Sequence, residues 1–199
     1  MFLDVGANEG RFSKHMRTAG YGGRLISFEP IPAECRKVER LAEGDPEWNV
    51  CCYALGDDTT QREFKINLTQ GTKTVFSSFR QVKDGVDCLS ESIPVKVYRL
   101  DDVLPSLISD IRRPRVFLKM DTQGFDRDVF DGAVNSMQSI VGLQSELSVI
   151  HLYDGVPHFT KNIEHYESFG FELMNLFVVS RSGDGRVAEY DCVMAKAGT

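Results

Sequence analysis

A glycine-bearing turn near the start of the chain constrains the fold more than any other feature. Residues 2–5 form an apolar run that predicts a buried strand, and residues 11–19 predict a helix. The turn between them holds Gly6 and Gly10, which let the backbone turn sharply and approach a ligand closely. A strand, a tight turn and a helix in this order are typical of a sheet built from parallel strands with right-handed crossovers.

The same alternation continues along the chain. We predict further strands at residues 24–28, 48–53, 63–68, 93–98, 116–120 and 140–147, and helices at 32–43, 100–108, 126–130 and 162–169. Residues 69–92 are polar and predict a loop or lid. Two apolar runs, 171–180 and 187–196, are joined by a turn with Gly183 and Gly185, which favours an antiparallel hairpin. We therefore expect an α/β fold in a single domain that spans residues 1–199.

Composition excludes several classes of protein. The 199 residues are 42% hydrophobic and 26% charged, which is ordinary for one globular domain. No apolar run approaches the ~20 residues needed to span a bilayer, so we expect no membrane span. The net charge of −6 argues against a nucleic-acid partner, because phosphate binding needs a basic surface. Since the chain opens directly on a core strand, we also expect that an N-terminal segment is missing.

The five cysteines carry no metal-ligand or disulfide spacing. They stand at positions 35, 51, 52, 88 and 192, and no C-x-x-C pair occurs among them. Zinc ligation would need paired spacing, so we expect no metal site. Free thiols in a reducing compartment are the prediction, which with the lack of a leader sequence favours a cytoplasmic protein.

The chemistry of the first turn favours a ligand other than a dinucleotide. Gly6 and Gly10 are separated by Ala7, Asn8 and Glu9, which departs from the G-x-G-x-x-G pattern that seats a pyrophosphate. Asp4 places a carboxylate beside the turn, where it would repel a pyrophosphate and attract a cationic amine. Glu29 follows the second strand, 19 positions after Gly10, close to the ~20 typical of an acid that binds ribose. A turn with a purely structural role is the alternative.

With these residues in view, the sequence resembles the S-adenosylmethionine (SAM)-dependent methyltransferases of the FkbM family. The segments that carry the resemblance are Asp4-Val5-Gly6-Ala7-Asn8-Glu9-Gly10, Phe28-Glu29-Pro30, Ala54-Leu55-Gly56-Asp57, Lys119-Met120-Asp121-Thr122-Gln123-Gly124 and Phe130-Asp131-Gly132-Ala133. Gln123 stands where many relatives have glutamate. The resemblance implies a Rossmann-like fold with a mostly parallel seven-stranded sheet and an antiparallel C-terminal hairpin.

The resemblance also implies roles for individual residues. Asp4 and the turn that follows it would hold the methionine part of SAM, Glu29 would bind the ribose, and the segment at 53–55 would border the adenine. The predicted cofactor-binding residues are Asp4, Gly6, Ala7, Asn8, Gly10, Glu29, Pro30, Ala54 and Leu55.

Candidate catalytic residues follow the later strands. Asp121 and Glu146 stand at predicted strand ends, the usual ligand edge of such sheets, and His151 lies in the next loop. We predict Asp121 as the group that orients the acceptor or takes its proton, with Glu146 and His151 as the next candidates. A solvated loop histidine is the alternative for His151. Lys119 is expected to lay its stem on the sheet and reach solvent with its amine.

The leading functional hypothesis is O-methylation of a hydroxyl on a sugar, glycan or secondary metabolite, with SAM as the cofactor. It rests on the resemblance, because the family is associated with such small-molecule or glycan acceptors. A non-catalytic SAM-binding or interaction domain is a second hypothesis, motivated by Gln123. An NAD-dependent oxidoreductase is a third, and both Asp4 and the turn spacing count against it.

Overall fold

A seven-stranded sheet forms the centre of the fold. The computed structural model describes residues 1–68, 77–81 and 89–198. The strands of this sheet are β1 (Phe2–Val5), β2 (Leu25–Phe28), β3 (Trp48–Cys51), β7 (Val116–Met120), β8 (Ile140–Ser148), β9 (Phe171–Arg181) and β10 (Val187–Lys196). Their order is β3-β2-β1-β7-β8-β10-β9, and β10 is antiparallel to both of its neighbours while the other pairs are parallel. The predicted sheet and its antiparallel C-terminal hairpin are confirmed.

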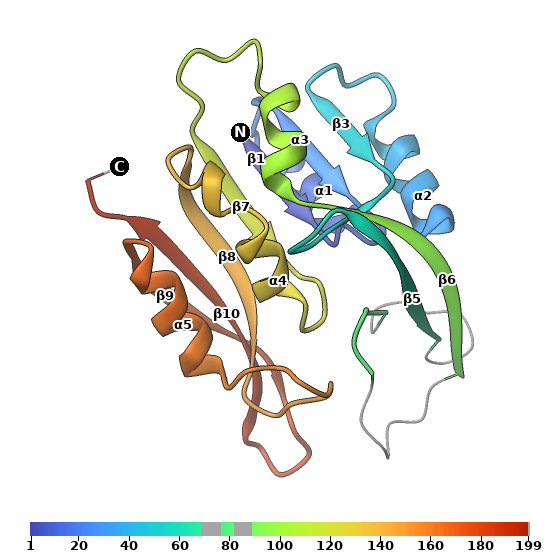
Figure 1. Cartoon of the computed structure of the whole chain (residues 1–199), viewed down its shortest axis with the longest axis vertical. Helices are drawn as coiled ribbons and strands as arrows, with labels where there is room; N and C mark the ends of the chain where they lie inside the picture. Colours follow the sequence, from blue (N-terminus) through green and yellow to red (C-terminus); the bar gives the residue numbers. More distant parts are fainter. Residues whose placement is uncertain (69–76, 82–88, 199) are drawn as a thin grey trace.

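Helices cover both faces of this sheet. They are α1 (Arg11–Thr18), α2 (Pro32–Ala42), α3 (Leu100–Leu107), α4 (Asp126–Asp131) and α5 (Phe159–Ser168), with a short 3-10 turn η1 (Val134–Ser136). Figure 1 shows α3, α4 and α5 in front of the sheet and α1 behind it. The main core lies under the front helices, where fully buried side chains such as Leu118, Phe130, Leu143 and Tyr166 gather. Among the described residues, no helix is long and apolar enough to cross a membrane.

A second, three-stranded sheet projects from the first and was not foreseen. It consists of β4 (Ala54–Leu55), β5 (Thr60–Leu68) and β6 (Leu89–Tyr98), in the order β4-β6-β5. The strand predicted at 48–53 ends at Cys51, because the chain leaves the main sheet there and joins the small one at Ala54, after two intervening residues. The strand predicted to begin at residue 93 begins at Leu89, so the end of the predicted lid is strand. The rest of that prediction falls largely on residues 69–76 and 82–88, which lie outside the described part of the chain.

The prediction that all cysteines are free thiols is wrong for two of them. Cys35 on α2 and Cys52, just after β3, form a disulfide with their Cα atoms 5.6 Å apart. Helix α2 packs on β3, and this tertiary contact brings together two cysteines whose spacing carries no disulfide pattern. Cys51 and Cys192 are free. The expectation of a reducing compartment rested on five free thiols, and the disulfide removes that support.

The fold places two functional loops side by side. Strands β1 and β7 are neighbours. From β1 the sheet continues through β2 and β3 to one edge, and from β7 it continues through β8 and β10 to β9 at the other edge. Ligands of open α/β sheets bind at such a switch point, beyond the carboxyl ends of the strands. The two loops touch there: a Cβ added to Gly6, after β1, would lie 2.0 Å from the carbonyl oxygen of Asp121, after β7. Only glycine fits at that position.

Candidate functional site

A cavity of about 390 Å³ lies at this switch point. Its size is within the range of small-molecule and cofactor sites. Polar groups from the first turn, from β2 and from β7, β8 and β10 line it, and aromatic and aliphatic side chains fill the space between them. The lining residues are Val5, Gly6, Ala7, Asn8, Glu9, Arg11, Phe12, Phe28, Glu29, Pro30, Ile31, Ala54, Leu55, Phe64, Ser77, Phe79, Lys119, Asp121, Thr122, Gln123, Phe125, Gln144, Glu146 and Asp191.

The first turn is wound through three left-handed residues. Gly6, Asn8 and Gly10 have φ values of 77°, 49° and 74°, and Gly10 leads directly into α1. The backbone N–H groups of Gly6 and Ala7 both donate to the carbonyl of Phe28, each over 3.1 Å. These bonds tie the turn to the end of β2. Of the predicted cofactor-binding residues in this turn, Gly6, Ala7 and Asn8 line the cavity, whereas Gly10 is not among the lining residues and shapes the turn instead.

Glu29 is held at the end of β2 by backbone donors. Its carboxylate accepts the N–H of Asn8 and the N–H of Ile31, each over 2.8 Å, and the residue is 4% exposed. Burial raises the pKa of Glu29 to about 7, against the opposing effect of these two hydrogen bonds. Each carboxylate oxygen can accept a second hydrogen bond, so Glu29 can still receive the two hydroxyls of a ribose from the cavity.

Asp4 occupies a different place from the one its sequence position suggested. It is fully buried and does not line the cavity. One of its oxygens accepts a bond from Lys119 Nζ at 2.9 Å, and the other accepts the Ser13 hydroxyl at 2.8 Å. The predicted solvent-exposed amine of Lys119 is therefore wrong: the residue is 4% exposed, and its amine lies between Asp4 and Asp121. Although burial disfavours the ammonium, these two carboxylates raise the pKa of Lys119 above its ordinary value.

Two predicted catalytic carboxylates lie together at the other end of the cavity. Asp121 follows β7, and Glu146 lies on β8, the next strand of the sheet. The side-chain amide of Gln123 donates to both, over 3.2 Å to Asp121 and 3.0 Å to Glu146. Burial, and then the nearby charges led by Asp121, raise the pKa of Glu146 well above its ordinary value. A raised pKa makes the ionised carboxylate a stronger base toward the proton of an acceptor.

Asp191 belongs to the same group and was missed by the sequence analysis. It lies on β10, directly opposite Glu146 in the strand register, and accepts a 3.0 Å hydrogen bond from Gln144. Burial raises the pKa of Asp191 to about 6, and the charge of Asp121 adds to this effect. The sequence signal that could have identified Asp191 is that it is a carboxylate within the predicted C-terminal hairpin. Its use required knowing that β10 inserts next to β8.

His151 is not brought into the cavity. It lies in the loop after β8, and its ring centroid is 6.4 Å from that of His158. Neither histidine occurs among the described residues that line the cavity. Of the three predicted catalytic residues, the structure thus groups Asp121 and Glu146 and places His151 outside.

Of the segment predicted to border an adenine, residues 54 and 55 line the cavity, whereas Tyr53 is not among the lining residues. Pro30, Ala54 and Leu55 are lining residues, and Phe28 and Ile31 add to the apolar wall. Ala54 and Leu55 form β4, and the pairing of β4 with β6 in the small sheet holds them at the cavity. Phe64, Phe79 and Phe125 close the wall, with ring centroids 4.8 Å apart for both Phe64–Phe79 and Phe79–Phe125.

The donor set fits SAM. Glu29 at the end of β2 suits a ribose, and the apolar wall beside it suits an adenine. On the other side of β1, Asp121 follows β7, about two strand spacings or roughly 10 Å from the end of β2, and Glu146 on β8 lies one spacing further; these carboxylates suit a cationic sulfur. The lining cations among the described residues are Arg11 and Lys119, and both are paired with carboxylates. This arrangement fits a cationic cofactor and would repel a pyrophosphate.

Comparison with solved structures shows a shared fold at low identity. A candidate S-adenosylmethionine dependent methyltransferase from Listeria monocytogenes is 8% identical with a TM-score of 0.52, and the match covers 98% of this chain and 90% of that one. A chain of the fibrillarin/Nop5p complex is 8% identical with a TM-score of 0.50, covering 98% and 71%. An uncharacterized Listeria monocytogenes serotype 4b protein is 6% identical with a TM-score of 0.50, covering 100% and 62%.

Sequence comparison gives the family. No curated protein sequence matches the chain. The model of the methyltransferase FkbM domain matches residues 4–173, which include the first turn, Glu29, Asp121 and Glu146. The matched segment is most of the chain, and it contains the cavity residues contributed by every strand except β10. The chain therefore belongs to the FkbM family of methyltransferases.

Proposed function

We propose that the chain uses SAM to methylate a hydroxyl of a small molecule such as a sugar, glycan or secondary metabolite. The observation that carries this proposal is the division of the cavity. Glu29 marks one end, and Asp121 and Glu146 mark the other, with an apolar wall near Glu29. Membership of the FkbM family supports methyl transfer as the reaction. The end at Glu29 suits the ribose of SAM, and the end at Asp121 and Glu146 suits its charged sulfur.

Bound SAM would supply an activated methyl group on a positively charged sulfur. What remains for the chain is to orient the acceptor hydroxyl and to take its proton. Asp121 is the more open of the two carboxylates, with 42% of its side chain exposed, and suits the orienting role. Glu146 is more buried and has the raised pKa, so its carboxylate Oε atoms are the proposed proton acceptors.

The charge of the acceptor end favours an acceptor without phosphate groups. Three carboxylates, Asp121, Glu146 and Asp191, line that end, and the ammonium of Lys119 is shared between Asp4 and Asp121. An anionic acceptor would meet net repulsion there, whereas a neutral hydroxyl can donate to these oxygens. This supports a neutral acceptor and disfavours a nucleic acid.

Substitution of Asp121 tests the proposed role. In Asp121→Ala we expect SAM binding to remain measurable in calorimetry but to weaken, because one carboxylate near the sulfur is lost, and methyl transfer at saturating SAM to fall by two orders of magnitude or more, as for loss of a proton-transfer or orienting group. Transfer is followed with methyl-labelled SAM on a panel of sugars, glycans and hydroxylated small molecules. Glu164→Ala, an exposed carboxylate on α5, is the matched control. Unchanged turnover in Asp121→Ala would contradict the assignment.

A further inference from the structure

The loop after β7 contains two consecutive left-handed residues, and the first is not glycine. Gln123 has a φ of 54° and Gly124 a φ of 85°. Left-handed backbone is uncommon in residues other than glycine, and it persists where the surroundings impose it, often at functional sites. We therefore expect the contacts that impose this backbone conformation to be related to the function of the loop.

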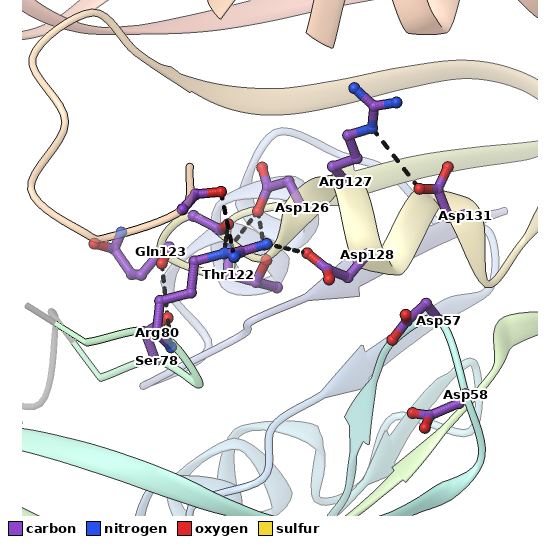
Figure 2. Close-up of polar contacts among 12 residues, drawn as sticks. Asp57, Asp58, Ser78, Arg80, Thr122, Gln123, Asp126, Arg127, Asp128 and Asp131 are labelled. Carbon is purple, nitrogen blue, oxygen red and sulfur yellow. Dashed lines mark hydrogen bonds and ion pairs between the residues drawn. The ribbon is translucent and has the colours of Figure 1, made fainter. Parts of the chain in front are cut away.

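A separate segment, the strap (residues 77–81), binds the backbone of this loop. Ser78 Oγ donates to the carbonyl of Gln123 over 2.8 Å, and Arg80 Nε donates to the carbonyl of Gly124 over 2.6 Å. Arg80 also pairs with Asp128 of α4 at 2.5 Å, so that one guanidinium joins the strap, the loop and the helix, as Figure 2 shows. The carbonyls of both left-handed residues are thus bound by side chains of the strap.

The side chain of Gln123 is fixed as completely as its backbone. Its Oε1 accepts the hydroxyl of Tyr153 over 3.0 Å, which orients the amide so that Nε2 faces the cavity. Nε2 then donates to Asp121 and to Glu146. One amide group therefore bridges two carboxylates that would otherwise repel each other, and its hydrogen bond favours the ionised form of the buried Glu146.

The surroundings of Glu146 make this bridge important. The carboxylates that face it come from two elements and one loop: Asp121 in the loop after β7, Asp126 of α4, and Glu189 and Asp191 of β10. Lys119 is the nearby cation, and its amine is engaged by Asp4 and Asp121. Burial and these four carboxylates all favour protonation of Glu146, and the amide of Gln123 opposes them.

We propose that Gln123, held by the strap, is a positioning residue that holds the carboxyl groups of Asp121 and Glu146 together, favours the ionised form of Glu146 and so makes the site prefer cationic SAM to its neutral demethylated product, S-adenosylhomocysteine (SAH). The inference rests on the proposed function. An ionised carboxylate near the sulfur attracts the sulfonium of SAM and has no comparable effect on the thioether of SAH. Preference for the charged form would also favour release of the product.

The experiment compares the dissociation constants of SAM and SAH over pH 5–9 by calorimetry. The ratio of the SAH constant to the SAM constant reports the carboxylates near the sulfur, because both ligands carry the same ribose and the titration of Glu29 cancels. In the unaltered protein we expect the ratio to rise with pH. In Gln123→Asn we expect the rise to occur at higher pH and the ratio at pH 7 to be roughly tenfold smaller, as for loss of one charge-assisted hydrogen bond.

Asparagine is chosen because it tolerates left-handed backbone but is one methylene shorter, so it cannot bridge both carboxylates. Ser78→Ala, which frees the carbonyl of Gln123, should shift the ratio in the same direction by less. Gln61→Asn, an exposed change on β5, should not shift it. A ratio and pH profile in Gln123→Asn equal to those of the unaltered protein would overturn this inference alone. Failure of the unaltered protein to bind either ligand would overturn the proposed function and this inference with it.

Discussion

At the scale of single residues, the buried pair of Lys119 and Asp4 connects the cofactor turn to the acceptor end of the cavity. Lys119→Met keeps the apolar stem and removes the ammonium, which leaves the fully buried Asp4 without its cation. Breaking a buried ion pair in this way costs about 3–5 kcal/mol. We expect a loss of that size in the free energy of unfolding measured with urea.

Lys161→Met supplies the comparison for this loss. Lys161 pairs with Glu164 on the exposed face of α5, where an ion pair contributes about 1 kcal/mol or less. Similar losses in the two variants would show that the Lys119 pair is not specially important.

Glu29 should make stability depend on pH. Burial raises its pKa to about 7 in the folded chain, against an ordinary value of 4.5. Its contribution to stability is therefore fully present below pH 4.5 and is lost as the pH rises through 7. The difference in unfolding free energy between the unaltered protein and Glu29→Gln should fall by up to about 3 kcal/mol over that range. Glu63→Gln, at an exposed site, should show no such trend, and parallel curves for Glu29→Gln would contradict the argument.

Single residues were predictable where local sequence determines their position. The turn at residues 6–8 and Glu29 lie at strand ends, and strand ends can be located from the apolar pattern. The burial of Asp4 by Lys119, and the grouping of Asp191 with Glu146, depend on which strands become neighbours. Strand order is a property of the whole sheet, so no local pattern reveals these contacts.

At the scale of elements, the disulfide joins α2 to the end of β3. The two cysteines are 17 positions apart, and closing a loop of that length contributes roughly 3 kcal/mol. We expect a reductant to lower the unfolding free energy of the unaltered protein by this amount and to leave the Cys35→Ser, Cys52→Ser double variant unaffected. Cys51→Ser retains the disulfide and should remain sensitive. An effect of reductant on the double variant would point to a different cause.

The elements of the main sheet were predicted more accurately than those of the small one. β1, β7 and β10 follow the predicted ranges, because their buried apolar runs are bounded by turn residues or charged positions. β4 has only two residues, which is too short for any periodicity to indicate. β6 carries Pro94 in its interior, and proline normally argues against a strand.

At the scale of the whole molecule, cofactor binding should stabilise the entire fold. The cavity draws residues from both sides of the switch point, so a ligand that binds only the folded chain stabilises both halves. At a SAM concentration 100 times the dissociation constant, the gain is about 2.7 kcal/mol, which raises the melting temperature of a chain this size by roughly 5–10 °C. NAD at the same concentration should cause no shift in a thermal scan. A comparable shift with NAD would favour the oxidoreductase hypothesis.

The position of β10 has a consequence for how the protein is made. Among the described residues β10 follows β9 in the sequence, yet it lies between β8 and β9 in the sheet. While the chain is being synthesised, the sheet has a gap until residues 187–196 have left the ribosome. During that interval β8 and β9 each lack the partner that β10 provides, and β9 carries Met174 and Phe177, which are exposed even in the complete fold. Unpaired apolar edges invite pairing with other chains. A nascent chain that stalls before β10 is therefore the form of this protein most exposed to aggregation, and the form for which a chaperone would matter most.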